Sequence, residues 1–170
     1  PTRPSLVPLV TEERWPAEAM GLSLRNVTLT LYDTVKKTTL FSEQGEMLFT
    51  HFGVSGPLVL SASAHIRPME PDRYQLFVDL KPALSEKQLD ARLLRDFSAN
   101  SNRDFVNSLG ALLPRKLIAP IVRLSGIPHA CKVHQITHEQ RQGLVALLKK
   151  LPMTVRDFRP IEEAIVTSGG

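Results

Sequence analysis

The densest group of residues that could do chemistry lies between positions 45 and 58. An apolar strand pattern ends at His51, and Gly53 and Gly56 permit a sharp turn before Pro57. Proline suits the first position of a helix, so this stretch predicts a strand, a turn and a helix start. Free backbone N–H groups at a helix start can bind an anion or a polarised oxygen atom. The alternative interpretation is a turn with a purely structural role.

Histidine and cysteine also gather within ten residues, at His129, Cys131, His134 and His138. These are zinc-binding residue types. However, Thr137 is a predicted helix N-cap, which places only one histidine of the last pair on the helix. Cys131 is the chain's single cysteine, so a thiolate-rich site and an intrachain disulfide are both excluded. We therefore expect no metal site, and interpret the histidines as polar residues of a loop and a helix start.

The middle of the chain is basic. Residues 81–150 hold twelve Lys and Arg against five Asp and Glu, a pattern that can indicate nucleic-acid binding. The charges are dispersed over several predicted helices, and Phe97 and Phe105 are the only aromatic residues there. We interpret this block as a solvated helical surface and expect nucleic acid not to be a partner. Neither Gly-x-Gly-x-x-Gly nor a P-loop occurs in the sequence.

The elements that must position these residues are of two kinds. Strands are predicted over 6–10, 22–33, 38–43, 46–50 and 74–80, with a hairpin turn at Gln44 and Gly45. Within 22–33 the apolar residues change phase, so we predict a β-bulge near Arg25 and Asn26. The strand pattern returns over 153–167, and we expect this last strand to complete the sheet that the first begins.

Helices are predicted over about 85–97, 102–109, 114–124 and 137–150. Ser85 with Gln88, and Thr137 with Gln140, fit capping boxes. The predicted fold class is α+β: a β-barrel-like domain with an inserted helical subdomain of about four helices. The barrel domain would be discontinuous, from 1–80 and 152–170, and would enclose the helical subdomain at 81–151.

Size and composition fit a globular protein, with 170 residues of which 42% are hydrophobic. No apolar run approaches the length of a membrane span and no signal-peptide pattern is present, so we expect a cytoplasmic protein that contacts no membrane. The chain opens without Met and closes on Gly169 and Gly170. We expect it to be an interior piece of a longer protein.

Four stretches, taken in order, resemble the bacterial aminoacetone-oxidase-type FAD-binding flavoproteins, a family that includes BaiN-like reductases. They are Pro-Ser-Leu-Val-Pro-Leu from residue 4, Gly-Leu-Ser-Leu-Arg-Asn-Val from residue 21, Phe-Thr-His-Phe-Gly-Val-Ser-Gly-Pro from residue 49, and Val-Thr-Ser-Gly-Gly at the end. The resemblance spans the chain and is weakest in the helices. It implies the inserted middle region of an FAD-dependent, NAD(P)H-linked oxidoreductase, whose flavin domain flanks this chain.

The resemblance also implies site residues. His51 would be catalytic, with a role in proton handling, and the substrate-binding positions would be Phe52, Gly53, Ser55, Gly56 and Pro57. The cofactor-binding positions would be Thr167, Ser168, Gly169 and Gly170. We expect FAD in the full-length protein and not in this fragment, which should be inactive alone. The substrate stays unidentified, and the rival hypothesis is a basic helical module that binds a protein or nucleic acid.

Overall fold

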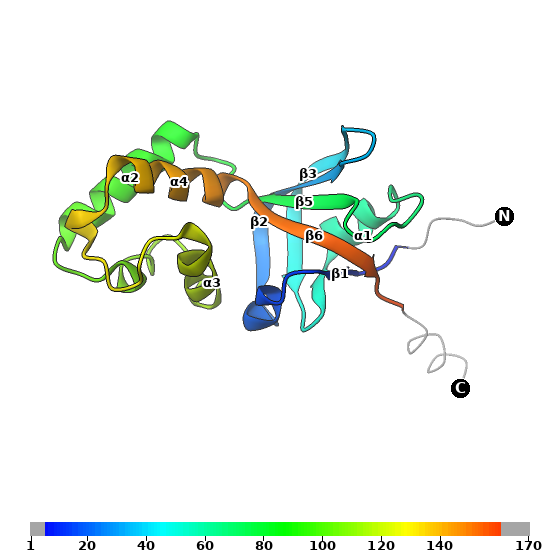
Figure 1. Cartoon of the computed structure of the whole chain (residues 1–170), viewed down its shortest axis with the longest axis horizontal. Coiled ribbons are helices and arrows are strands. Elements are labelled where there is room, and N and C mark those ends of the chain that lie inside the picture. The colour runs from blue at the N-terminus through cyan, green and yellow to red at the C-terminus, as the bar shows by residue number, and fades with distance from the viewer. Residues whose placement is uncertain (1–5, 161–170) are drawn as a thin grey trace. The chain divides into compact units, whose positions relative to one another are not determined.

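The computed structural model describes residues 6–160 of the chain (Figure 1). These residues fall into two compact units. The first contains residues 6–78 and 152–160, and the second is Asp79–Leu151. The chain therefore leaves the first unit after Val78 and re-enters it at Pro152.

The first unit is a closed barrel of strands in the order β1-β4-β3-β2-β5-β6, which confirms the predicted α+β class with a β-barrel. The strands are β1 (Leu9–Thr11), β2 (Ser23–Asp33), β3 (Thr38–Phe49), β4 (Gly53–Ser55), β5 (Tyr74–Asp79) and β6 (Leu151–Phe158). A 3-10 turn, η1 (Trp15–Ala19), and the short helix α1 (Pro57–Ser63) belong to the same unit. Alternate residues of β2 and β5 are buried, as the period of a strand requires.

The predicted bulge in β2 is confirmed. The pairing of β2 with β3 shifts register between Leu24 and Val27, which is where the apolar residues change phase. Leu24, Val27 and Leu29 are all buried as a result. The two residues in between, Arg25 and Asn26, are exposed. The bulge therefore returns both halves of the strand to one buried face.

The predicted hairpin at Gln44 and Gly45 is wrong, because β3 runs through both residues and pairs them with β2. Gly45 is explained by packing instead. A Cβ atom at this position would lie 3.1 Å from the Leu58 side chain of α1, so glycine lets the helix approach the strand. The real turn follows Asp33, whose carboxylate accepts the N–H groups of Val35 and Lys36 at 3.0 and 3.1 Å.

The barrel closes between its first and last strands. β1 pairs with β6 antiparallel, which confirms that the last strand completes the sheet begun by the first. The Glu13 carboxylate reinforces this closure, since it accepts the Thr154 N–H at 2.7 Å and the Thr154 hydroxyl at 2.9 Å. Residues 161–167 of the predicted strand lie outside the described part of the chain.

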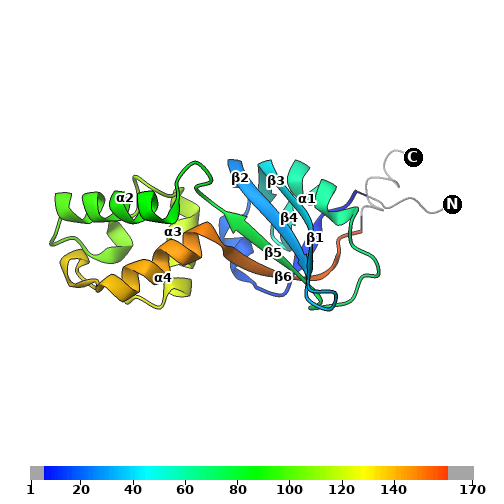
Figure 2. The same cartoon turned by 90° about the horizontal axis from the view of Figure 1, so that it is seen from above.

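The second unit contains α2 (Glu86–Ala99), α3 (Arg115–Ser125) and α4 (His138–Lys149), with the 3-10 turns η2 (Phe105–Asn107) and η3 (Val133–Gln135). Both predicted capping boxes are present, at the starts of α2 and α4. These two helices lie side by side (Figure 2), and an ion pair joins Arg141 to Asp90. No helix within residues 6–160 has the length and apolar character needed to cross a bilayer.

The helix predicted over 102–109 is reduced to the single turn η2. Its backbone pairs with a distant segment instead. The N–H groups of Phe105 and Val106 donate to the carbonyls of Cys131 and His129 at 2.8 and 3.0 Å. Asp104 forms an isolated β-bridge with Lys132, and their side chains form an ion pair of 2.7 Å. Long-range pairing thus replaces the helical hydrogen bonds of this segment.

Candidate functional site at the end of the barrel

The candidate site is the turn that connects β3 to β4. The Thr50 hydroxyl accepts the N–H groups of Phe52 and Gly53 at 3.3 and 3.0 Å. The Thr50 N–H donates to the Gly53 carbonyl at 3.0 Å. These three hydrogen bonds fix the backbone of the turn and leave His51 exposed at its tip. A histidine held in this way can meet a ligand that approaches from outside the barrel.

The two glycines that sequence analysis singled out are required by packing. A Cβ atom at Gly53 would lie 2.4 Å from the Leu9 carbonyl oxygen and 2.8 Å from the Thr11 nitrogen. Gly56 has φ of 91°, and a Cβ there would lie 2.9 Å from the Leu48 nitrogen. Pro57 is the first residue of α1, as predicted, and Gly56 is the N-cap. Neither glycine offers an open backbone cradle, since neighbouring strands fill the space above both.

An aromatic and cationic group surrounds the tip of the turn. The rings of His51 and Phe52 meet edge to face with centroids 5.1 Å apart. The Arg159 guanidinium lies over the Phe52 ring, 4.6 Å from its centroid, in a cation–π arrangement. The backbone N–H of Arg159 donates to the Pro8 carbonyl at 2.9 Å. This bond holds the chain just beyond β6 beside β1.

Arg159 does not stand out in the sequence. It contacts Phe52 because barrel closure brings the end of β6 next to the β3–β4 turn, and no local pattern predicts that contact. The structure therefore groups His51 and Phe52 with a cation. An imidazole can exchange a proton, and a guanidinium can hold an anion or a polarised carbonyl oxygen.

The remaining predicted positions divide into two sets. Ser55 is partly buried and Pro57 is exposed, both within the same β4–α1 segment. Thr167, Ser168, Gly169 and Gly170 lie outside the described residues. Within residues 6–160, no three His, Cys, Asp or Glu side chains lie close enough together to hold a metal ion.

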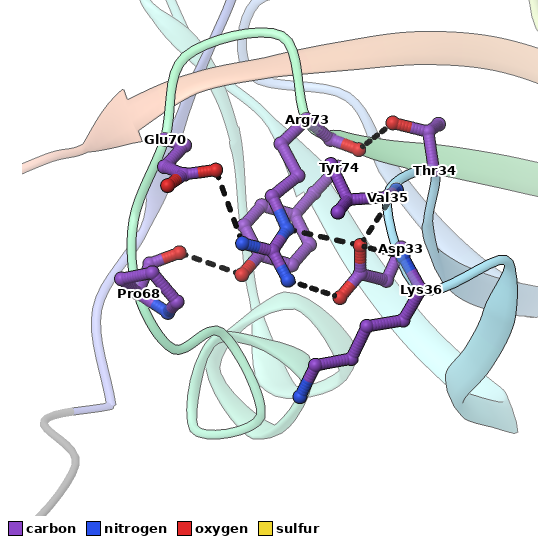
Figure 3. A network of polar contacts seen from close by, with 8 residues as sticks. All are labelled: Asp33, Thr34, Val35, Lys36, Pro68, Glu70, Arg73 and Tyr74. Atoms are coloured by element: carbon purple, nitrogen blue, oxygen red, sulfur yellow. Dashed lines mark hydrogen bonds and ion pairs between the residues drawn. The ribbon is translucent and has the colours of Figure 1, made fainter.

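A buried polar network lies elsewhere on the barrel (Figure 3). Arg73 donates to both carboxylate oxygens of Asp33 at 3.0 and 2.9 Å, and to Glu70 at 3.0 Å. The guanidinium holds the pKa of Asp33 at about 2, below its ordinary value of 3.8. Burial raises the pKa of Tyr74, whose hydroxyl donates to the Pro68 carbonyl at 2.6 Å. The network anchors the β2–β3 turn to the start of β5, which indicates a structural role.

The helical unit has a groove of about 300 Å³ between the end of α2 and η3. Its apolar lining comes from Leu94, Phe97, Val133 and Ile136. Arg141 lies at its rim but is committed to Asp90 by an ion pair, with side chains 13% and 20% exposed. The groove is also lined by the polar residues Ser98, Ser101 and His134, so it combines apolar and polar contacts.

Comparison with known proteins identifies the family. The model described as "HI0933-like protein barrel and H2TH domain" matches residues 3–166. The chain belongs to this family of FAD-dependent oxidoreductases, so the predicted resemblance is confirmed.

Two relatives match the whole chain. It is 30% identical to a ribosomal RNA dihydrouridine synthase of Escherichia coli and 25% identical to a 3-dehydro-bile acid delta(4,6)-reductase of Clostridium scindens. The chain spans 40% and 41% of the lengths of these relatives.

Proposed function

We propose that this chain is the substrate-side insert of an FAD-dependent, NAD(P)H-linked oxidoreductase, and that catalysis requires a flanking FAD-binding domain. The observation that carries the proposal is that the family model of a barrel and H2TH domain matches nearly the whole chain. The chain also aligns with only 40% of the length of the Escherichia coli relative. The proposed domains are 1–80 with 152–170 for the barrel and 81–151 for the helical insert.

The packing of the described residues supports the proposal that FAD binds to the flanking domain and that this chain faces the substrate. Dinucleotide cofactors need a glycine-rich backbone cradle, and both glycines of the candidate site are closed off by neighbouring strands. FAD, when bound, supplies the hydride chemistry, and the protein supplies positioning and electrostatics. Within this chain, His51 and Phe52 would face the substrate, while residues 167–170 would approach the cofactor.

The first prediction concerns FAD itself. Titration of the 170-residue chain with FAD is expected to give no stoichiometric binding at micromolar concentration, measured by flavin fluorescence. The longer protein that contains this chain should purify with FAD bound and should oxidise NADPH or NADH. Tight, stoichiometric FAD binding by the 170-residue chain would contradict the proposal.

The second prediction concerns His51. In the longer enzyme, His51→Gln is expected to lower kcat by about 10²-fold or more, because general acid–base groups typically contribute that much. It should also remove one limb of the pH profile of kcat. His65→Gln is the matched control, since His65 is another exposed histidine of the barrel unit. If both variants keep the parent's pH profile, His51 has no role in proton transfer.

A further inference from the structure

The apolar groove between the end of α2 and η3 is one part of a larger hollow in the helical unit. Beside the groove lies a polar depression of about 370 Å³, which is lined by Asn100, Ser101, Asn102 and Arg103. Ser101 lines both, so the groove of about 300 Å³ and the depression adjoin at this residue. Together they form the α2–η3 hollow. Its size and its mixture of apolar and polar walls are typical of sites for small organic molecules.

Backbone hydrogen bonds hold the walls of the α2–η3 hollow together. The His134 N–H donates to the Ser101 carbonyl at 3.3 Å, and the Val133 N–H donates to the Arg103 carbonyl at 3.0 Å. Both bonds join η3 to the segment that follows α2. The hollow is therefore formed without a ligand, as sites for small molecules usually are.

Core packing of α2 does not explain Leu94. The buried residues of this helix are Leu89, Leu93 and Phe97, which follow one stripe of its surface. Leu94 lies outside that stripe, is 43% exposed and lines the groove. Its apolar surface, with that of the half-buried Ile136, is therefore available to the apolar part of a ligand.

The charge of the α2–η3 hollow favours an anion. Arg103 is exposed, and within residues 6–160 its guanidinium forms no hydrogen bond or ion pair. Arg141, the other arginine of the lining, is paired with Asp90. Among these described residues, no Asp or Glu lines either part of the hollow. A guanidinium binds carboxylates and phosphates through paired hydrogen bonds, and the side-chain amides of Asn100 and Asn102 can donate further ones.

We propose that the α2–η3 hollow binds a small organic anion, with its apolar body against Leu94 and Ile136 and its carboxylate or phosphate group on Arg103. A neutral ligand would leave the guanidinium without a partner, and an inorganic ion would leave Leu94 uncovered. A molecule that carries both an apolar and an anionic part uses both features of the hollow. The inference does not depend on the proposed function, because every residue that it uses belongs to the helical unit.

The test is a titration of the ¹⁵N-labelled 170-residue chain with naphthalene probes, followed by NMR of its backbone amides. The anionic probes are 2-naphthoate and 2-naphthyl phosphate, and 2-naphthamide is a neutral counterpart of similar shape. We expect the signals of Ser101, Arg103 and His134 to shift. At least one anion should bind about tenfold more tightly than the amide, because hydrogen bonds between charged groups are the stronger ones. The anion that binds more tightly identifies the head group as carboxylate or phosphate.

Two variants separate the parts of the site. Arg103→Gln should weaken binding of the anions by about tenfold and leave that of 2-naphthamide unchanged. Leu94→Ser should weaken binding of all the probes. Both side chains are exposed, so the melting temperature of each variant should stay near the parent's. Arg95→Gln is the matched control, since Arg95 is an exposed arginine of α2 that lines neither part of the hollow.

The control should bind every probe as the parent does. The inference is overturned if neither anion binds at millimolar concentration, or if the anions bind no more tightly than the amide. It is also overturned if Arg103→Gln and Arg95→Gln weaken binding of the anions equally, or if the shifted signals lie outside the lining of the hollow.

Discussion

Gly53→Ala is expected to destabilise the barrel by about 3 kcal/mol or more, among the largest effects of a single substitution. The new Cβ would be placed 2.4 Å from the Leu9 carbonyl oxygen, and both atoms belong to paired strands. Neither backbone can move without breaking the β1–β4 ladder that helps to close the barrel. Thermal unfolding followed by fluorescence measures the loss. Trp15, the chain's single tryptophan, reports on the barrel because its ring lies 5.6 Å from that of Phe49.

Gly143→Ala is the matched control. Gly143 lies in α4, and a Cβ there would meet no atom within 4 Å. Alanine is the better helix former by about 1 kcal/mol, so this variant should be more stable than the parent. If Gly53→Ala melts at the parent's temperature, β4 does not pack this closely against β1.

The result also bears on how the candidate site is built. The glycines near His51 look like the marks of a ligand-binding loop when they are considered as sequence alone. In the structure the space around both glycines is filled by neighbouring strands of the barrel, so the proposed chemistry depends on the side chains at the tip of the turn. A stable barrel end is therefore what holds His51 and Phe52 in position, and substitution of the glycines should act on the proposed site through the stability of the barrel.

Local rules predicted the features that depend on neighbouring residues. The bulge in β2 follows from a phase change within one strand, and the caps of α2 and α4 follow from residues three positions apart. The hairpin predicted at Gly45 is wrong because glycine is needed there for a different reason, namely the close approach of the Leu58 side chain from α1. The segment 102–109 failed to form a helix because residues 129–132 supply its backbone partners.

The same distinction applies to the candidate site. His51 and Phe52 could be singled out because they lie in one short motif, whereas the contact of Arg159 with Phe52 could not be predicted, because only barrel closure brings the two together. Arg73 and Asp33 are 40 residues apart, and neither stands out from the surrounding charged residues in the sequence. Contacts of this kind need the topology of the barrel, which local periodicity does not specify.

The Asp33–Arg73 pair leads to a pH-dependent prediction. The pKa of Asp33 is about 2 in the folded chain, chiefly because of the hydrogen bonds from Arg73, against an ordinary value of 3.8. The folded state therefore takes up this proton less readily than the unfolded state. The stabilisation is complete above pH 3.8 and is lost as the pH falls towards 2. The urea midpoint of the parent chain, followed by Trp15 fluorescence, should fall over this interval.

Arg73→Gln should change both the size and the direction of this dependence. Without the guanidinium, the carboxylate of Asp33 stays buried with only 2% of its side chain exposed, so the variant should be strongly destabilised at pH 7. The variant lacks the main cause that lowers the pKa of Asp33, so this carboxyl takes up a proton at a higher pH than in the parent, and protonation relieves the buried charge. The difference between parent and variant should thus shrink as the pH falls from 7 towards 3. Arg25→Gln, which changes an exposed arginine of β2, should leave the difference near zero throughout. A constant difference between the parent and Arg73→Gln at all pH values would show that Arg73 acts through packing rather than through its charge.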